Sequence, residues 1–107
     1  MSWESLLKVG GGSRIPSNIR APAFRKAIMD AAMNAGAQFT LREIHEPFLE
    51  NYTNELVNAG LAPRHAAKAA GKYRTFSSFY PLAGRYFKLI GRERTSEGEL
   101  TFYEIKR

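Results

Sequence analysis

The sequence predicts a mainly α-helical domain that ends in a β-hairpin. Apolar residues recur at helical spacing from Phe24 to about Tyr80, whereas the last part of the chain is rich in aromatic and β-branched residues. The chain has 107 residues and is 44% hydrophobic, which is enough for one packed core. We therefore predict one domain over residues 22–107, preceded by a flexible basic arm over residues 1–21.

The arm is predicted from its linker-type composition. Residues 10–13 read Gly-Gly-Gly-Ser, and Pro16 and Ser17 follow shortly after. Arg14 and Arg20 give this segment a positive charge. Because chain termini of this kind are often poorly ordered, we expect the packed part of the chain to begin at Pro22.

The first helix is expected to start at Pro22, because proline suits the first helical position. Phe24, Ile28 and Ala31 continue at helical spacing until Gly36, which can end a helix in the left-handed conformation. Residues 37–39 then form a short extended link.

The second helix is expected to begin after Thr40, because Thr40 and Glu43 have the spacing of a capping box. Pro47 falls in the second turn and should kink or restart the helix. Apolar residues continue at helical spacing beyond Pro47, and Gly60 ends the region.

A third helix over residues 63–80 is predicted to be amphipathic and basic, and Pro81 and Gly84 should end it. One face carries the polar side chains Arg64, Lys68, Lys72 and Thr75. The opposite face is expected to pack on the core and carries Ala66, Ala70, Tyr73, Phe76 and Tyr80. Gly71 lies in mid-helix at a cost of about 1 kcal/mol relative to alanine, so it marks a break or a place where another group comes close.

The hairpin is predicted from residues 85–90 and 99–105, with the polar residues 95–98 between them. Tyr103 and Ile105 are assigned to the face that packs on the core. Arg92 and Arg94 are expected at the start of the tip, where their side chains can reach outward.

The positive charge is concentrated in one third of the chain. The net charge is +6, and residues 61–94 hold eight of the 16 basic residues against the single acid Glu93. Residues 42–58 are biased the other way. A basic surface of this kind favours an acidic partner such as a nucleic acid.

Several classes of site are absent from the sequence. The chain has no cysteine, which excludes disulfides, thiol nucleophiles and thiolate metal sites. His45 and His65 are the only histidines, no His-x-x-x-His pair occurs, and Asp30 is the only aspartate. We therefore predict no enzyme, no metal and no cofactor. Because no long apolar segment is present, we expect no membrane association and a cytoplasmic or nucleoid-associated protein.

The order of helix, short strand, helix, basic helix and hairpin resembles the winged helix-turn-helix superfamily over about residues 22–107. The resemblance is carried by residues 39–44 (Phe-Thr-Leu-Arg-Glu-Ile) and by residues 89–94 (Leu-Ile-Gly-Arg-Glu-Arg), which continue through Gly98 to residues 102–105 (Phe-Tyr-Glu-Ile). The stretch from Pro47 to Gly60 is longer than the second helix and turn of the usual motif. The resemblance implies three helices plus a wing.

The leading prediction is a sequence-specific double-stranded DNA-binding protein, used as a small transcriptional regulator and plausible as a homodimer. A recognition helix over about residues 63–80 would enter the major groove, and the wing would touch the DNA backbone or the minor groove. The expected DNA-binding residues are Arg64, Lys68, Lys72, Arg74, Thr75, Arg92 and Arg94.

Two alternatives use the same basic surface. The first is a protein-interaction module that docks an acidic partner protein, with an apolar anchor among Tyr73, Phe79, Tyr80 and Phe87. The second is RNA binding, in which unpaired bases stack on Tyr73, Phe76, Phe79 and Tyr86.

Overall fold

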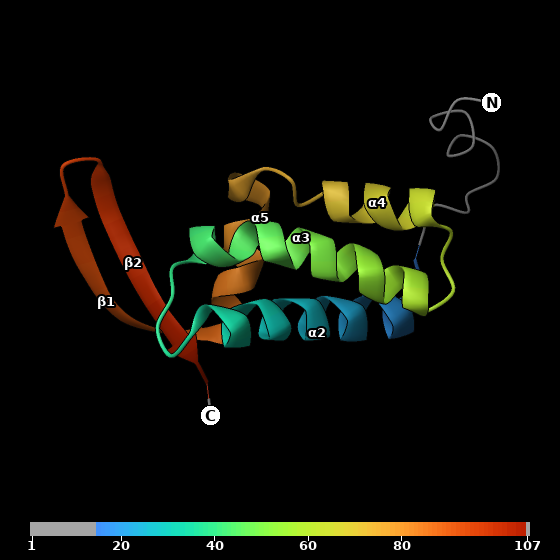
Figure 1. The fold of residues 1–107 in the computed structure, drawn as a ribbon, viewed down its shortest axis with the longest axis horizontal. Helices are drawn as coiled ribbons and strands as arrows, with labels where there is room; N and C mark the ends of the chain where they lie inside the picture. Colours follow the sequence, from blue (N-terminus) through green and yellow to red (C-terminus); the bar gives the residue numbers. More distant parts are fainter. Residues whose placement is uncertain (1–14, 107) are drawn as a thin grey trace.

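The computed structural model describes residues 15–106 and contains helices followed by an antiparallel hairpin (Figure 1). The predicted mainly helical fold with a C-terminal hairpin is thus confirmed. Residues 1–14 of the predicted arm lie outside the described residues. The elements are α2 (Ser17–Ala35), α3 (Leu41–Asn58), α4 (Pro63–Gly71), α5 (Phe76–Ala83), the 3-10 turn η1 (Gly84–Tyr86), β1 (Phe87–Thr95) and β2 (Gly98–Ile105).

The first helix is longer than predicted. α2 begins at Ser17 rather than at Pro22, with Pro16 as the residue that precedes its first turn. Residues 17–21 therefore belong to a helix and not to an arm. The predicted stop is confirmed: α2 ends at Ala35, and Gly36 has a φ of 119°, a backbone conformation that residues other than glycine rarely adopt.

Three prolines lie inside helices rather than at their ends. Pro22, Pro47 and Pro81 are the sixth or seventh residue of their helices, and α3 runs through Pro47 without a restart. Pro81 does not end a helix as predicted, since α5 continues to Ala83, but α5 does end just before Gly84, the second predicted stop. All three prolines are exposed, as are the residues four positions before them, so water can reach the carbonyl groups that each proline leaves without a donor.

The start of α3 is held as predicted. Glu43 N donates to Thr40 Oγ1 at 3.3 Å, and Thr40 N donates to Glu43 Oε1 at 3.2 Å. This reciprocal pair is a complete capping box, which satisfies two amides that would otherwise have no partner.

The predicted single helix over residues 63–80 is wrong, because the chain forms α4, a tight turn over residues 72–75, and α5. Glycine favours such a break, and α4 ends at Gly71. The Tyr73 carbonyl accepts a hydrogen bond of 2.7 Å from His45 Nε2 on α3, in place of the backbone hydrogen bond that a continuous helix would give it. Thr75 is extended, with φ −83° and ψ 141°, and α5 starts after it.

The break changes which aromatic residues are buried. Tyr73 is buried and Phe76 is partly buried against the core, as predicted, but Tyr80, which was also predicted to face the core, is 50% exposed, and Phe79 is fully buried in its place. A new helix start resets the direction in which each later side chain points. The face predicted from a continuous helix therefore fails at Tyr80.

The helices pack around an aromatic core. α3 lies between α2 and α4 (Figure 1). Phe48 on α3 is at the centre of the aromatic core. The Phe48 ring lies 4.8 Å from Phe24 on α2, 5.5 Å from Tyr52 and 5.0 Å from Phe79 on α5, measured between ring centroids. Burial raises the pKa of Tyr52 to about 12. This ring cluster joins three of the helices.

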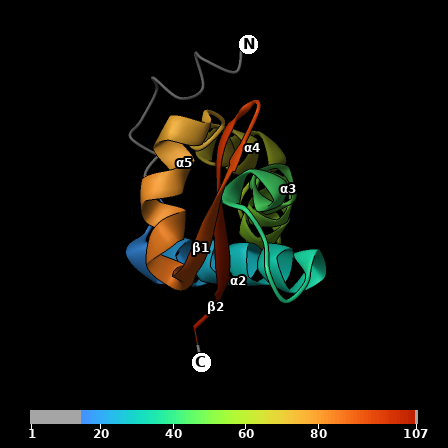
Figure 2. The same cartoon turned by 90° about the vertical axis from the view of Figure 1, so that its left-hand side faces the viewer.

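The hairpin is attached at its base and projects at its tip. Tyr103 N donates to the Phe39 carbonyl at 2.8 Å, and Phe39 N donates to the Tyr103 carbonyl at 3.1 Å. The Phe39 ring also lies 4.8 Å from that of Phe87. Tyr103 and Ile105 pack against the core, as predicted. In Figure 2 the hairpin is nearest to the viewer, with α5 on one side of it and α3 on the other.

Both strands extend further toward the tip than predicted, and β1 begins at Phe87 rather than at Arg85, because residues 84–86 form η1. β1 runs to Thr95, so Arg92 and Arg94 lie within a paired strand rather than at the start of a loop. Arg92 is the register partner of Thr101, and Arg94 is that of Glu99. None of the helices over residues 15–106 is long and apolar enough to span a bilayer.

Candidate nucleic-acid interface

The amphipathic division of α4 is confirmed. Arg64 and Lys68 are exposed one turn apart, while Ala66 and Ala70 are buried on the opposite side. Ala67, between the two exposed basic residues, is also exposed. The outer face of α4 therefore carries long cationic side chains separated by small residues.

The positive charge continues into the turn after α4. Lys72 and Arg74 are exposed, and Lys72 Nζ lies 5.9 Å from the centroid of the Tyr73 ring. Thr75 belongs to the start of α5, where its hydroxyl is hydrogen-bonded to that of Ser78. The predicted group on one helix is thus divided between α4, the turn and the start of α5.

Arg20 joins this surface from α2 and was missed as a site residue. Arg20 and Lys72 line the same hollow of about 490 Å³, together with Tyr52 and Tyr73. Its position one helical turn before Phe24, a core residue, was the signal in the sequence, but the assignment of residues 1–21 to an arm concealed it. We use the name basic surface for Arg20, Arg64, Lys68, Lys72 and Arg74.

Four of the five residues of the basic surface, all but Arg20, lie in the segment from residue 56 to 92, which contains neither aspartate nor glutamate. Over residues 15–106, Arg20, Lys72 and Arg74 form no ion pair with a carboxylate. Acidic groups are used elsewhere: Lys26 Nζ lies 3.1 Å from both Asp30 and Glu55. The basic surface is therefore a region of positive charge that a polyanion can neutralise.

The predicted wing residues are not part of this surface. Figure 1 shows the hairpin at the end of the molecule away from α4. Arg92 and Arg94 are exposed, but Arg92 Nε lies 3.5 Å from Glu99 Oε1. Glu93 and Glu97 are also on the distal half of the hairpin, so its charge is mixed.

The aromatic residues proposed as anchors for a protein or for RNA are mostly covered. Tyr73, Phe79 and Phe87 are buried, whereas Tyr80 is half exposed. The Phe76 ring is only partly accessible and lies 4.3 Å below the guanidinium carbon of Arg42. Tyr86 is also half-buried. Of the four anchors considered for a protein partner, Tyr80 alone is exposed.

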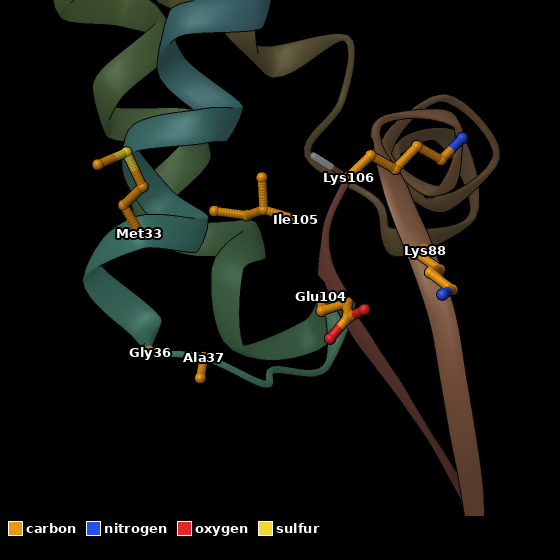
Figure 3. Close-up of a pocket in the computed structure, with 7 residues that line it drawn as sticks. All are labelled: Met33, Gly36, Ala37, Lys88, Glu104, Ile105 and Lys106. Carbon is orange, nitrogen blue, oxygen red and sulfur yellow. The ribbon is translucent and has the colours of Figure 1, made fainter.

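A larger hollow of about 880 Å³ lies between the end of α2 and the base of the hairpin (Figure 3). Its lining combines two lysines, Lys88 and Lys106, with Glu104, which is the register partner of Lys88. In Figure 3 the Lys106 side chain extends away from Met33, and its Nζ donates to the Arg85 carbonyl at 3.2 Å. The mixed charge distinguishes this hollow from the basic surface.

No group of three or more histidine, aspartate or glutamate residues suited to a metal ion occurs in residues 15–106. His45, one of the two histidines, packs within the fold. Its ring stacks on that of Phe79 with centroids 4.6 Å apart, and its Nε2 donates a hydrogen bond to the Tyr73 carbonyl. This histidine therefore fixes the turn that carries Lys72 and Arg74.

Comparison with protein-family models, curated proteins and solved structures gives no match for this chain. The functional argument therefore rests on the surface itself.

Proposed function

We propose that this protein binds double-stranded DNA through the basic surface and acts as a small transcriptional regulator. The observation that supports this proposal best is a group of five cationic side chains: Arg64, Lys68, Lys72 and Arg74 lie in the segment from residue 56 to 92, which contains no acid, and Arg20 on α2 lines a hollow together with Lys72. Lysine and arginine that contact phosphates release counterions from DNA, and this supplies most of the affinity for any duplex.

α4 is the proposed recognition helix, in place of the longer helix expected over residues 63–80. Its nine residues are about 13.5 Å long at 1.5 Å per residue, and the diameter of an α-helix with its side chains, about 10–12 Å, matches the width of about 12 Å of the major groove. Gly71 lies on the exposed side, and a Cβ added there would meet no atom of the chain within 4 Å. Its small size leaves room for the backbone of a partner.

The basic residues have different proposed roles. Lys68 and Lys72 carry point charges and suit phosphate contacts, whereas the planar guanidinium of Arg64 suits the paired acceptors of a guanine. Phosphate contacts position the protein on the duplex, and the base contact supplies sequence preference. A helix this short reads few base pairs, which favours a homodimer on DNA.

The winged-helix relation is part of the proposal. The antiparallel bridge between Phe39 and Tyr103 supports it, because it joins the segment before α3 to the hairpin that would form the wing. α5 is a departure: it lies between the basic helix and the hairpin and carries no charged residue. The charge that a recognition helix needs is on α4 instead.

The test measures fluorescence anisotropy of labelled duplex DNA, single-stranded DNA and structured RNA with the full chain. We expect the duplex to bind most tightly. Arg64→Ala should lower affinity for a selected site by about 1–3 kcal/mol and affinity for random duplex by less. Tighter binding to RNA or to a single strand would refute the proposal, and equal losses on both duplexes would remove the base-reading role of Arg64.

The wing has its own test. Because Glu99 partly neutralises Arg92, the double change Arg92→Ala and Arg94→Ala should lower duplex affinity by less than about tenfold and leave the melting temperature nearly unchanged. Duplex titrations and thermal melts on the same samples measure both quantities. A loss as large as that of Lys68→Ala combined with Lys72→Ala would place the wing among the main contacts.

A further inference from the structure

A second hollow adjoins the basic surface, between the start of α2, the turn after α4 and the segment from α5 to η1. Its volume is about 500 Å³, within the range of roughly 300–1,000 Å³ of small-molecule sites. Its lining combines the three cations Arg20, Lys72 and Arg85 with the rings of Phe24, Tyr73 and Tyr86. We call it the aromatic-basic hollow.

The cations of this hollow come from three separate parts of the chain. Arg20 is on α2, Lys72 follows α4, and Arg85 is in η1. All three side chains are exposed, no carboxylate lines the hollow, and within residues 15–106 none of the three forms an ion pair with an acid. Three positive charges brought together without an acid create a local potential that favours an anion.

The rings give the hollow an apolar floor. Phe24 and Tyr73 are buried and Tyr86 is half-buried, so each ring presents only part of its surface. The Phe24 ring lies 5.3 Å from that of Tyr73 and 5.6 Å from that of Tyr86. These mutual contacts hold the floor in place before any ligand arrives, which lowers the entropy lost on binding.

Tyr73, whose ring carries a hydroxyl group, is one of the residues that line the hollow. Burial raises the pKa of Tyr73, although the positive charge of Arg20 acts in the opposite direction. The phenol therefore keeps its proton at neutral pH and can donate a hydrogen bond to an anionic oxygen.

We propose that the aromatic-basic hollow binds a small aromatic anion, a flat ring that bears a phosphate or a carboxylate. The ring would lie against Tyr86 and Phe24, and the anionic group would lie among Arg20, Lys72 and Arg85, whose two guanidinium groups match the geometry of phosphate and carboxylate oxygens. An inorganic anion would leave the apolar floor in contact with water, and a neutral ring would leave the cations without a partner.

Titration calorimetry with the full chain, in the absence of DNA, tests the site with four probes. Adenosine 5′-monophosphate and benzoate each combine a ring with an anion, inorganic phosphate supplies the anion alone, and adenosine supplies the ring alone. We expect at least one aromatic anion to bind about tenfold or more tightly than phosphate and adenosine. Absence of saturable binding by both, or equal binding of phosphate alone, would overturn the proposal.

Arg85→Gln tests the location, because Arg85 lies in the hollow but outside the basic surface. We expect it to weaken the binding of the aromatic anion about tenfold or more, with the melting temperature nearly unchanged. Lys88→Gln is the matched control, since it removes one exposed charge from the other hollow, shown in Figure 3. Equal affinities in Arg85→Gln and in the unchanged protein would place the ligand elsewhere.

Lys72 belongs both to the aromatic-basic hollow and to the basic surface. A bound anion neutralises Lys72 and Arg20, so saturation with the aromatic anion should weaken duplex binding about tenfold or more, a consequence that rests on the proposed function. Unchanged duplex affinity at saturation would refute this coupling. Because the calorimetry contains no DNA, a failure of the proposed DNA binding is distinguished from a failure of the site.

Discussion

Removal of a single charge from the basic surface should change the salt dependence of duplex binding by a fixed amount. The basic surface offers five cations, and each phosphate contact contributes about −0.9 to the slope of log K against log salt concentration. The expected slope for the unchanged protein is therefore about −4.5, and Lys72→Ala should reduce it to about −3.6. Lys72 is exposed in a turn, so its truncation should leave the fold intact.

These slopes convert into affinities that an ordinary titration resolves. Between 50 and 200 mM salt, the unchanged protein should lose about 500-fold in duplex affinity and Lys72→Ala about 150-fold. The assay is fluorescence anisotropy with one random duplex at four or more salt concentrations. Lys88→Ala is the matched control, because it removes an exposed lysine that lies outside the basic surface, and it should keep the slope of the unchanged protein.

Two results would refute this reasoning. A slope near zero for the unchanged protein would show that phosphate neutralisation does not drive binding. The second result is an unchanged slope for Lys72→Ala together with a less negative slope for Lys88→Ala. It would place the phosphate contacts at the hairpin end of the molecule.

Three further predictions concern the fold and its surface. Phe79→Ala should lower the free energy of unfolding by about 3–5 kcal/mol, whereas Tyr80→Ala should change it by less than about 0.5 kcal/mol; the reverse order in urea titrations would contradict the helix break. Gly71→Ala should raise the melting temperature slightly, through higher helix propensity, and lower duplex affinity by crowding the outer face of α4; unchanged affinity would mean that DNA does not approach there. The raised pKa of Tyr52, about 12, favours the protonated native state, so the stability that this group contributes is complete below about pH 10 and is lost as the pH rises to about 12. Urea titrations across that range should show a smaller loss in Tyr52→Phe, and an equal loss would exclude Tyr52 as the cause.

The parts of the fold that sequence predicted well are those fixed by nearest neighbours along the chain. The capping box of Thr40 and Glu43 and the division of α4 into basic and buried faces depend on residues three or four positions apart. Gly36 likewise ends α2 through its own backbone conformation.

The parts that sequence did not predict depend on distant contacts. In the sequence, Gly71 allowed a break, but the turn that follows α4 is held by a hydrogen bond from His45, which lies on another helix, to the Tyr73 carbonyl, and this contact could not be predicted. The ion pair of Arg92 with Glu99 follows from the register of the two strands, which contains an irregularity between Leu89 and Gly91. Neither contact leaves a periodic signal in the sequence.

The proximity of Arg20 to Lys72 has the same origin. It requires both the early start of α2 and the packing of α4 against α3, and each is a tertiary feature. The candidate site could therefore be predicted as a charge on one helix, but its extension onto α2 needed the structure.

The irregularity in strand pairing between Leu89 and Gly91 divides the hairpin into a base that is joined to the helices and a distal half that ends in the tip. On the base side, the mutual hydrogen bonds of Phe39 and Tyr103 tie the strands to the body of the protein; on the tip side, the side chains of β1 are mostly exposed. The distal half of the hairpin should therefore open locally at lower free energy than the base. Backbone pairs that are open to solvent separate more readily than pairs that pack on a core. Amide protons beyond Gly91 should exchange with deuterium well before the Tyr103 amide.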